Sequence, residues 1–119
     1  MPPEKRNAAY LWDMLEAAKE VVSLTAGMRY EQYLSDRVRQ LAIERLVEII
    51  GEAARHVSDG FKMDHGEIPW RKITAQRHVL AHEYGDIEQE RMWLVATIHV
   101  VELIAQLEPL LPEPPQEAE

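Results

Sequence analysis

The sequence predicts an all-α protein, an up-and-down bundle of four to five helices in a single domain. Apolar residues recur with the period of an α-helix along most of the 119 residues, and no segment alternates as a β-strand does. Glycines and prolines fall between the periodic segments, where helices commonly end and begin. A chain of this length can bury one core without disulfides or a structural metal.

Three helices are predicted in the first half of the chain. Residues 8–25 form a helix that ends before Gly27, and residues 30–34 form a short one. Ser35 or Asp36 then caps a long helix that runs to about residue 57. Gly51 lies inside it at a cost of about 1 kcal/mol relative to alanine, which we attribute to the close approach of a neighbouring helix. The apolar stripe of the long helix is predicted to be Val38, Leu41, Ala42, Leu46, Ile49, Ala53 and Val57.

Two further helices are predicted in the second half. Residues 58–68 contain two turn signals and are expected to form a loop, after which Pro69 suits the first turn of a helix over 70–84. Gly85 stops that helix, and Asp86 caps a last one that reaches about residue 111 before Pro112. The folded domain is therefore expected to span 1–111, followed by a disordered tail rich in proline and glutamate over 112–119.

The last predicted helix is apolar over a wide arc. One row comprises Leu94, Ile98, Val101 and Ala105, and the other comprises Trp93, Val100, Leu103 and Leu107. A helix that is buried on one side needs only one such stripe. The second row predicts burial on two sides, either within the bundle or across a dimer.

Composition limits the kinds of function that the protein can have. The absence of cysteine excludes disulfides, thiolate metal sites and cysteine nucleophiles. No apolar run near 20 residues and no signal peptide are evident, so we expect a cytoplasmic protein without a membrane span. The net charge of −8 by itself argues against RNA binding. An acidic chain can still have a local basic site, here Arg71, Lys72 and Arg77, or meet a basic partner.

The predicted helix over 70–84 has an arginine in the middle of its apolar stripe. Arg77 is costly there unless it is paired, for example with Glu52 or Glu83, or unless the stripe is not simply core. His78 and His82 stand four residues apart, a spacing that could hold a metal. Because no carboxylate–histidine pattern completes such a site, we expect no metal and no cofactor.

The segment from Arg77 to Tyr84, Arg-His-Val-Leu-Ala-His-Glu-Tyr, resembles the R-x4-6-H motif of the HEPN superfamily in the form typical of HepT toxins. Two upstream stretches, Ile-Gly-Glu-Ala-Ala at 50–54 and Ile-Pro-Trp at 68–70, are similar to the same family. The resemblance covers nearly the whole chain in length and helix order. HepT-like sequences usually have asparagine where His78 stands, and the wider superfamily also accepts aspartate or histidine there.

The resemblance implies a HEPN-like fold and a metal-independent endoribonuclease that is the toxin of a toxin–antitoxin pair. Arg77 and His82 would be catalytic, with His78 a supporting residue of the motif. The 2′-OH of the RNA would act as nucleophile, which restricts cleavage to RNA. The resemblance also implies a symmetric homodimer and a nucleotidyltransferase antitoxin that attaches AMP to Tyr84.

Helix geometry limits how Arg77 and His82 can share a substrate. Five residues of ideal helix separate them by about 140° and by roughly 7.5 Å along the axis. Either the helix loosens near His82, or a second protomer completes the site. Two other functions remain open, namely a non-catalytic helical module that docks a nucleotidyltransferase and a metal-binding bundle that uses His78, His82 and carboxylates.

Overall fold

The computed structural model describes residues 4–82 and 88–111, and these are almost entirely helical. The helices are α1 (Lys5–Thr25), α2 (Tyr30–Leu34), α3 (Arg37–His56), α4 (Asp59–Asp64) and α5 (Trp70–His82), followed by α6 (Gln89–Leu94), a π-helical turn (Val95–His99), α7 (Val100–Leu107) and a 3₁₀ turn (Glu108–Leu110). No strand occurs in these two ranges. The predicted all-α class is therefore confirmed.

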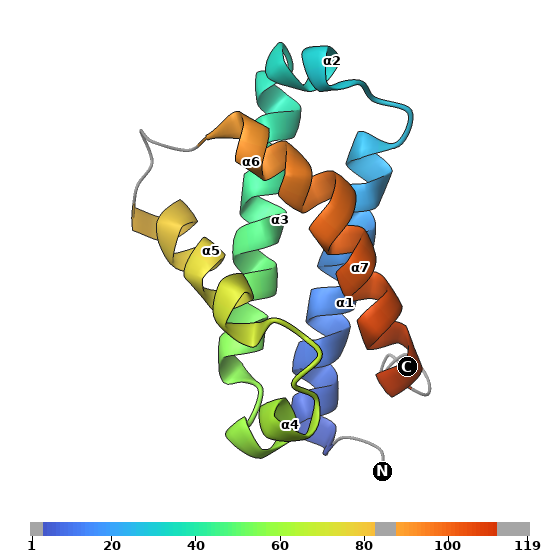
Figure 1. Cartoon of the computed structure of the whole chain (residues 1–119), viewed down its shortest axis with the longest axis vertical. Helices are drawn as coiled ribbons and strands as arrows, with labels where there is room; N and C mark the ends of the chain where they lie inside the picture. The colour runs from blue at the N-terminus through green and yellow to red at the C-terminus, as the bar shows by residue number, and fades with distance from the viewer. Residues whose placement is uncertain (1–3, 83–87, 112–119) are drawn as a thin grey trace, which may run out of the picture.

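The four long helical segments run alternately up and down (Figure 1). α1 and α3 pack against each other, and α5 packs on α3. In Figure 1, α3 lies between α5 and α1, while α6 and α7 run obliquely across α3 and α1. The helices that carry Gly51 and Arg77, α3 and α5, are thus direct neighbours.

The apolar face of α1 forms the centre of the core. Leu11, Met14, Ala18 and Val21 are fully buried, in agreement with the predicted stripe of this helix. The helix ends near Gly27, whose φ of +70° is a left-handed conformation that glycine adopts without strain. From α7, Val100, Leu103 and Leu107 join the same core.

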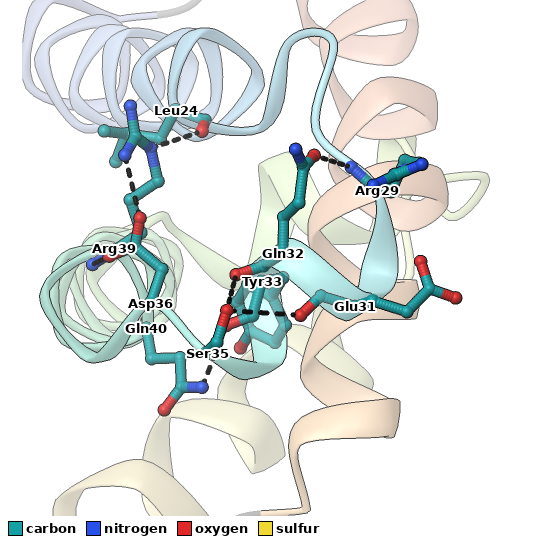
Figure 2. Close-up of polar contacts among 9 residues, drawn as sticks. All are labelled: Leu24, Arg29, Glu31, Gln32, Tyr33, Ser35, Asp36, Arg39 and Gln40. Carbon is teal, nitrogen blue, oxygen red and sulfur yellow. Dashed lines mark hydrogen bonds and ion pairs between the residues drawn. The ribbon is translucent and has the colours of Figure 1, made fainter.

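Hydrogen bonds connect the end of α1, the short helix α2 and the start of α3, where the chain reverses direction (Figure 2). The Asp36 carboxylate accepts a hydrogen bond from the Arg39 backbone N–H at 3.0 Å, which confirms it as the cap of α3. Arg39 Nε donates to the Leu24 carbonyl at 3.2 Å and so ties α3 to the end of α1. The buried Gln40 amide donates to the Tyr33 carbonyl at 2.9 Å.

The stripe predicted for the first half of α3 was wrong. Val38 and Leu41 are 77% and 50% exposed, whereas Gln40 and Glu44 are buried. Both buried polar side chains have partners, since Gln40 caps carbonyls of α2 and Glu44 accepts from Gln89 Nε2 at 2.9 Å. A polar side chain with such partners can occupy a buried position. A prediction based on apolar residues alone therefore placed the wrong face of α3 in the core.

The loop expected over 58–68 contains a helix, α4, which is a second correction. The Ser58 hydroxyl accepts from the Phe61 backbone N–H at 3.3 Å and caps α4. The buried Asn7 side chain holds Ser58 through two hydrogen bonds of 2.9 and 3.0 Å. The predicted start of the next helix, after Pro69, is confirmed.

The last helical segment is continuous from Gln89 to Leu110 but contains the π-helical turn. Of its two apolar rows, Val100, Leu103 and Leu107 are buried in the chain, and Trp93 is partly buried. The other row is exposed, with Leu94, Ile98 and Val101 each 44–49% accessible. The bundle therefore buries only one of the two rows.

The same segment qualifies the prediction that no apolar run approaches membrane-span length. Gln89–Leu110 has 22 residues and is apolar enough to cross a membrane by length and composition, although its buried row packs against α1. The predicted stop at Gly85, cap at Asp86, closing Pro112 and tail over 112–119 lie outside the described residues.

Candidate active site

The site is built where α5 comes closest to α3, at a glycine. A Cβ on Gly51 would lie 2.1 Å from Arg77 Cβ and 3.0 Å from the Ile73 carbonyl oxygen. No side chain larger than hydrogen fits at that separation, so the glycine sets the distance between the two helices. The close approach predicted from Gly51 is confirmed, and it brings Arg77 against α3.

Arg77 forms an ion pair with the neighbour of this glycine. Arg77 Nη2 lies 3.0 Å from Glu52 Oε2, with the two side chains 27% and 40% exposed. The predicted pairing of Arg77 with Glu52 is therefore confirmed. The other predicted partner, Glu83, lies outside the described residues. The pair is not a two-pronged fork. Arg77 Nε and Glu52 Oε2 are buried without a hydrogen-bond partner among the described residues.

The other oxygen of Glu52 is held from its own helix. His56 Nε2 lies 3.1 Å from Glu52 Oε1, in a hydrogen bond that the imidazole N–H donates. This bond, followed by the positive charge of Arg77, lowers the pKa of Glu52 below its ordinary value. The His56 ring in turn stacks on Tyr10 of α1, with centroids 5.2 Å apart. Together these four residues, Arg77, Glu52, His56 and Tyr10, form the Arg77 cluster.

An open groove of about 280 Å³ borders this cluster. Its walls come from α1, α3 and α5, and its lining residues are Tyr10, Asp13, Arg45, Glu48, Ile49, Glu52, Ala53, His56 and Arg77. Arg45 pairs with Glu48, so both arginines of the groove are matched with glutamates of α3. Sequence reasoning missed Tyr10 of α1 and Arg45 of α3, because only the packing of α1 and α5 on α3 brings them to one groove with Arg77.

The remaining predicted site residues are only partly described. His78 and His82 belong to the regular helix α5, and their side chains lie outside the description. Tyr84, the predicted modification site, lies wholly outside the described residues. Arg71 and Lys72, the expected basic residues near the start of α5, are exposed. Within the described part of the chain, no group of three or more histidine, aspartate or glutamate side chains could hold a metal ion.

Comparison with known proteins identifies similar sequences. The family described as Ribonuclease HepT-like matches residues 14–110, which include both α3 and α5. A Thermococcus cleftensis protein named "Probable ribonuclease HepT" is 34% identical over 107 residues, covering 90% of this chain and 97% of that protein.

Proteins of Methanocaldococcus jannaschii are also similar. Two examples both have names that begin "Putative RNase". One is 30% identical over 92% of this chain and 90% of its own length, and the other is 29% identical over 84% and 92%. No solved structure was matched.

Proposed function

Because the chain belongs to the HepT-like ribonuclease family, we propose that it is a metal-independent endoribonuclease toxin that cleaves RNA with Arg77 and His82. The observation that carries the proposal is the placement of Arg77. Its guanidinium is fixed at the edge of an open groove, where Gly51 lets α5 contact α3. We place this reaction in the cytoplasm.

The chemistry divides between the two residues. The 2′-oxygen of a ribose attacks the adjacent phosphorus as its proton leaves, the bond to the 5′-oxygen breaks, and that oxygen receives a proton. His82 can transfer these protons because imidazole titrates near neutral pH, and such catalysis contributes about 10²- to 10⁴-fold. Arg77 supplies a permanent positive charge against the phosphate oxygens.

We further propose that the complete site forms in a symmetric homodimer. α5 stays helical through His82, so a loosened helix does not bring the two residues to one phosphate. A two-fold axis that sets Arg77 of one protomer opposite His82 of its partner solves this problem. The exposed row Leu94, Ile98 and Val101 offers an apolar surface for the contact.

Mixing two inactive variants tests both the residues and the dimer. Arg77→Ala and His82→Ala should each abolish RNA cleavage while the circular dichroism spectrum stays that of the wild type. Refolded together in equal amounts, they should regain about a quarter of wild-type activity, since half of the dimers contain one intact composite site of two. Full activity of either variant alone would overturn the proposed residues, and no recovery on mixing would overturn the shared site.

A second arm of the same experiment addresses metals. EDTA should leave the cleavage rate within about twofold of its starting value, because no step uses a metal ion. Loss of activity on chelation, restored by Zn²⁺, would instead favour the metal-binding bundle that uses His78 and His82.

Control by a nucleotidyltransferase antitoxin is the last part of the proposal. AMP transferred to the Tyr84 hydroxyl would place a phosphate negative charge about 20° from Arg77 around an ideal helix, where it would compete with RNA phosphate. Intact-mass spectrometry after incubation with ATP and the antitoxin should show an AMP adduct that Tyr84→Phe prevents. An adduct on Tyr10, Tyr30 or Tyr33, or none, would contradict this assignment.

A further inference from the structure

We propose that Glu52 is a positioning residue, which holds the Arg77 guanidinium in the orientation that cleavage requires, and that His56 holds Glu52. This inference rests on the proposed role of Arg77 and assigns function to two residues outside the R-x4-H motif. The two oxygens of the Glu52 carboxylate contact two different residues. Oε2 lies 3.0 Å from Arg77 Nη2, and Oε1 lies 3.1 Å from His56 Nε2.

The contact between α3 and α5 at Gly51 positions the first part of the Arg77 side chain. Gly51 allows Arg77 Cβ to lie against α3, at a distance that leaves no room for even a methyl group on the glycine. The root of the arginine side chain is thereby fixed. Only the side-chain torsion angles of Arg77 remain free. An arginine whose torsion angles are not held in place loses conformational entropy when it binds a phosphate.

Glu52 positions the guanidinium at the end of the Arg77 side chain. The ion pair takes up Nη2 without forming the two-pronged fork, so the guanidinium is anchored by one corner and still borders the groove. Here Nε is buried without a partner among the described residues. Glu52 therefore holds one end of the guanidinium, while Arg77 still lines the groove.

His56 limits where Glu52 can go. Its hydrogen bond to Oε1 and its stacking on Tyr10 link the carboxylate to α1, whose apolar face lies in the core. Arg55 Nη1, at 3.6 Å from the same oxygen, adds only a longer and more exposed contact. Glu52 is therefore oriented from one side by His56 and orients Arg77 on the other.

Three variants of the full-length protein separate positioning from simple stabilisation. Glu52→Gln should lower kcat by about 10- to 100-fold, with KM changed less than about threefold, because a misplaced group loses rate more than affinity. Glu52→Asp keeps the charge and should recover part of the loss. Glu67→Gln is the matched control, since it breaks a contact of 3.3 Å with His65 that is outside the groove, and it should stay within about twofold of wild type.

An NMR measurement reports on the environment of the Arg77 side chain independently of catalytic activity. In a ¹H–¹⁵N spectrum the Arg77 Nε–Hε signal, identified by its absence in Arg77→Ala, should be sharp in wild type because Nε is buried. It should broaden or shift in Glu52→Gln and remain unchanged in Glu67→Gln. His56→Gln leaves the ion pair in place, so it tests the same chain if Glu52→Gln does not fold, and kcat should fall about 3- to 10-fold.

The outcomes distinguish this inference from the proposed function. In one outcome, Arg77→Ala is inactive, but Glu52→Gln and His56→Gln have the same kcat and the same Nε–Hε signal as the control Glu67→Gln. The positioning role of Glu52 is then wrong, and the catalytic role of Arg77 stands. If Arg77→Ala keeps full activity, the proposed function itself fails. A fall in melting temperature with no change in kcat or in the Arg77 signal would make Glu52 a structural residue only.

Discussion

Two polar clusters lie at opposite ends of α3, and they are constructed differently. The Tyr33 cluster joins α2, α3 and α6 around Gln89, which accepts a hydrogen bond from the Tyr33 hydroxyl and donates to Glu44 at 2.9 Å. The Arg77 cluster joins α1, α3 and α5 around Glu52. In the first cluster Gln89 lies between Tyr33 and Glu44, and in the second Glu52 lies between Arg77 and His56.

The difference is in how completely the polar atoms are satisfied. Tyr33 and Glu44 are buried, and each has a hydrogen-bond partner, so that cluster stabilises one arrangement of helices. The Arg77 cluster is partly exposed, borders a groove and leaves a buried N–H without a partner among the described residues. The Tyr33 cluster is thus a buried joint between helices, whereas the Arg77 cluster is open to a groove.

The largest expected effect comes from breaking the approach of α5 at the Arg77 cluster. In Gly51→Ala, the new Cβ would meet Arg77 Cβ at 2.1 Å, so the backbone of α5 must shift. Cleavage should fall by about 100-fold, and stability should fall by about 1–3 kcal/mol in spite of the better helix propensity of alanine. Gly60→Ala in α4, where a Cβ meets nothing within 4 Å, is the control for kinetics and urea unfolding. Wild-type activity in Gly51→Ala would contradict this account of the site.

A second prediction separates the two clusters by their need for a partner protomer. Val101→Glu places a charge on the exposed apolar row, so it should yield monomers at micromolar concentration and lower activity by about tenfold or more. Analytical ultracentrifugation and RNA cleavage measure the two effects. Val38→Glu, at an exposed valine of α3 outside this row, should change neither. A fully active monomeric Val101→Glu protein would show that the Arg77 cluster is complete in one chain.

The Tyr33 cluster should affect stability alone. Gln89→Ala removes the partner of the Tyr33 hydroxyl and of Glu44, and unsatisfied buried groups should cost about 1–3 kcal/mol in urea unfolding. The activity of the folded protein should stay within about twofold of wild type. Gln106→Ala, which removes only an exposed hydrogen bond to the Glu67 carbonyl, is the control and should cost less. A large loss of activity in Gln89→Ala would remove the distinction between the clusters.

The smallest effect is a pH dependence. Burial, followed by the charge of Glu44, raises the pKa of Tyr33 above its ordinary value of 10.0. The stability that this contributes is fully present below pH 10.0 and is lost as the pH rises toward the higher folded-state pKa, because the unfolded chain ionises first. Thermal melts between pH 9 and 11 should therefore fall more steeply for wild type than for Tyr33→Phe. Parallel curves would indicate that the tyrosine is not shielded as described.

The sequence alone determined the helical class, most helix boundaries and the approach of two helices at Gly51. These follow from local physics, since periodicity, caps and glycine act within a few residues of the chain. It also identified Glu52 as a possible partner of Arg77, although Glu83 was an equal candidate. The family resemblance likewise came from residues that lie close together along the chain, between Ile50 and Tyr84.

Only the tertiary structure decided which polar residues of α3 are buried and what surrounds Arg77. Gln40 and Glu44 are buried because α2 and α6 bring hydrogen-bond partners to them, and neither partner is adjacent in sequence. Tyr10 reaches His56 across 46 positions of the chain because α1 packs on α3. Side-chain hydrogen bonds and stacking depend on contacts between distant segments, whereas hydrophobic periodicity reports only on a single helix.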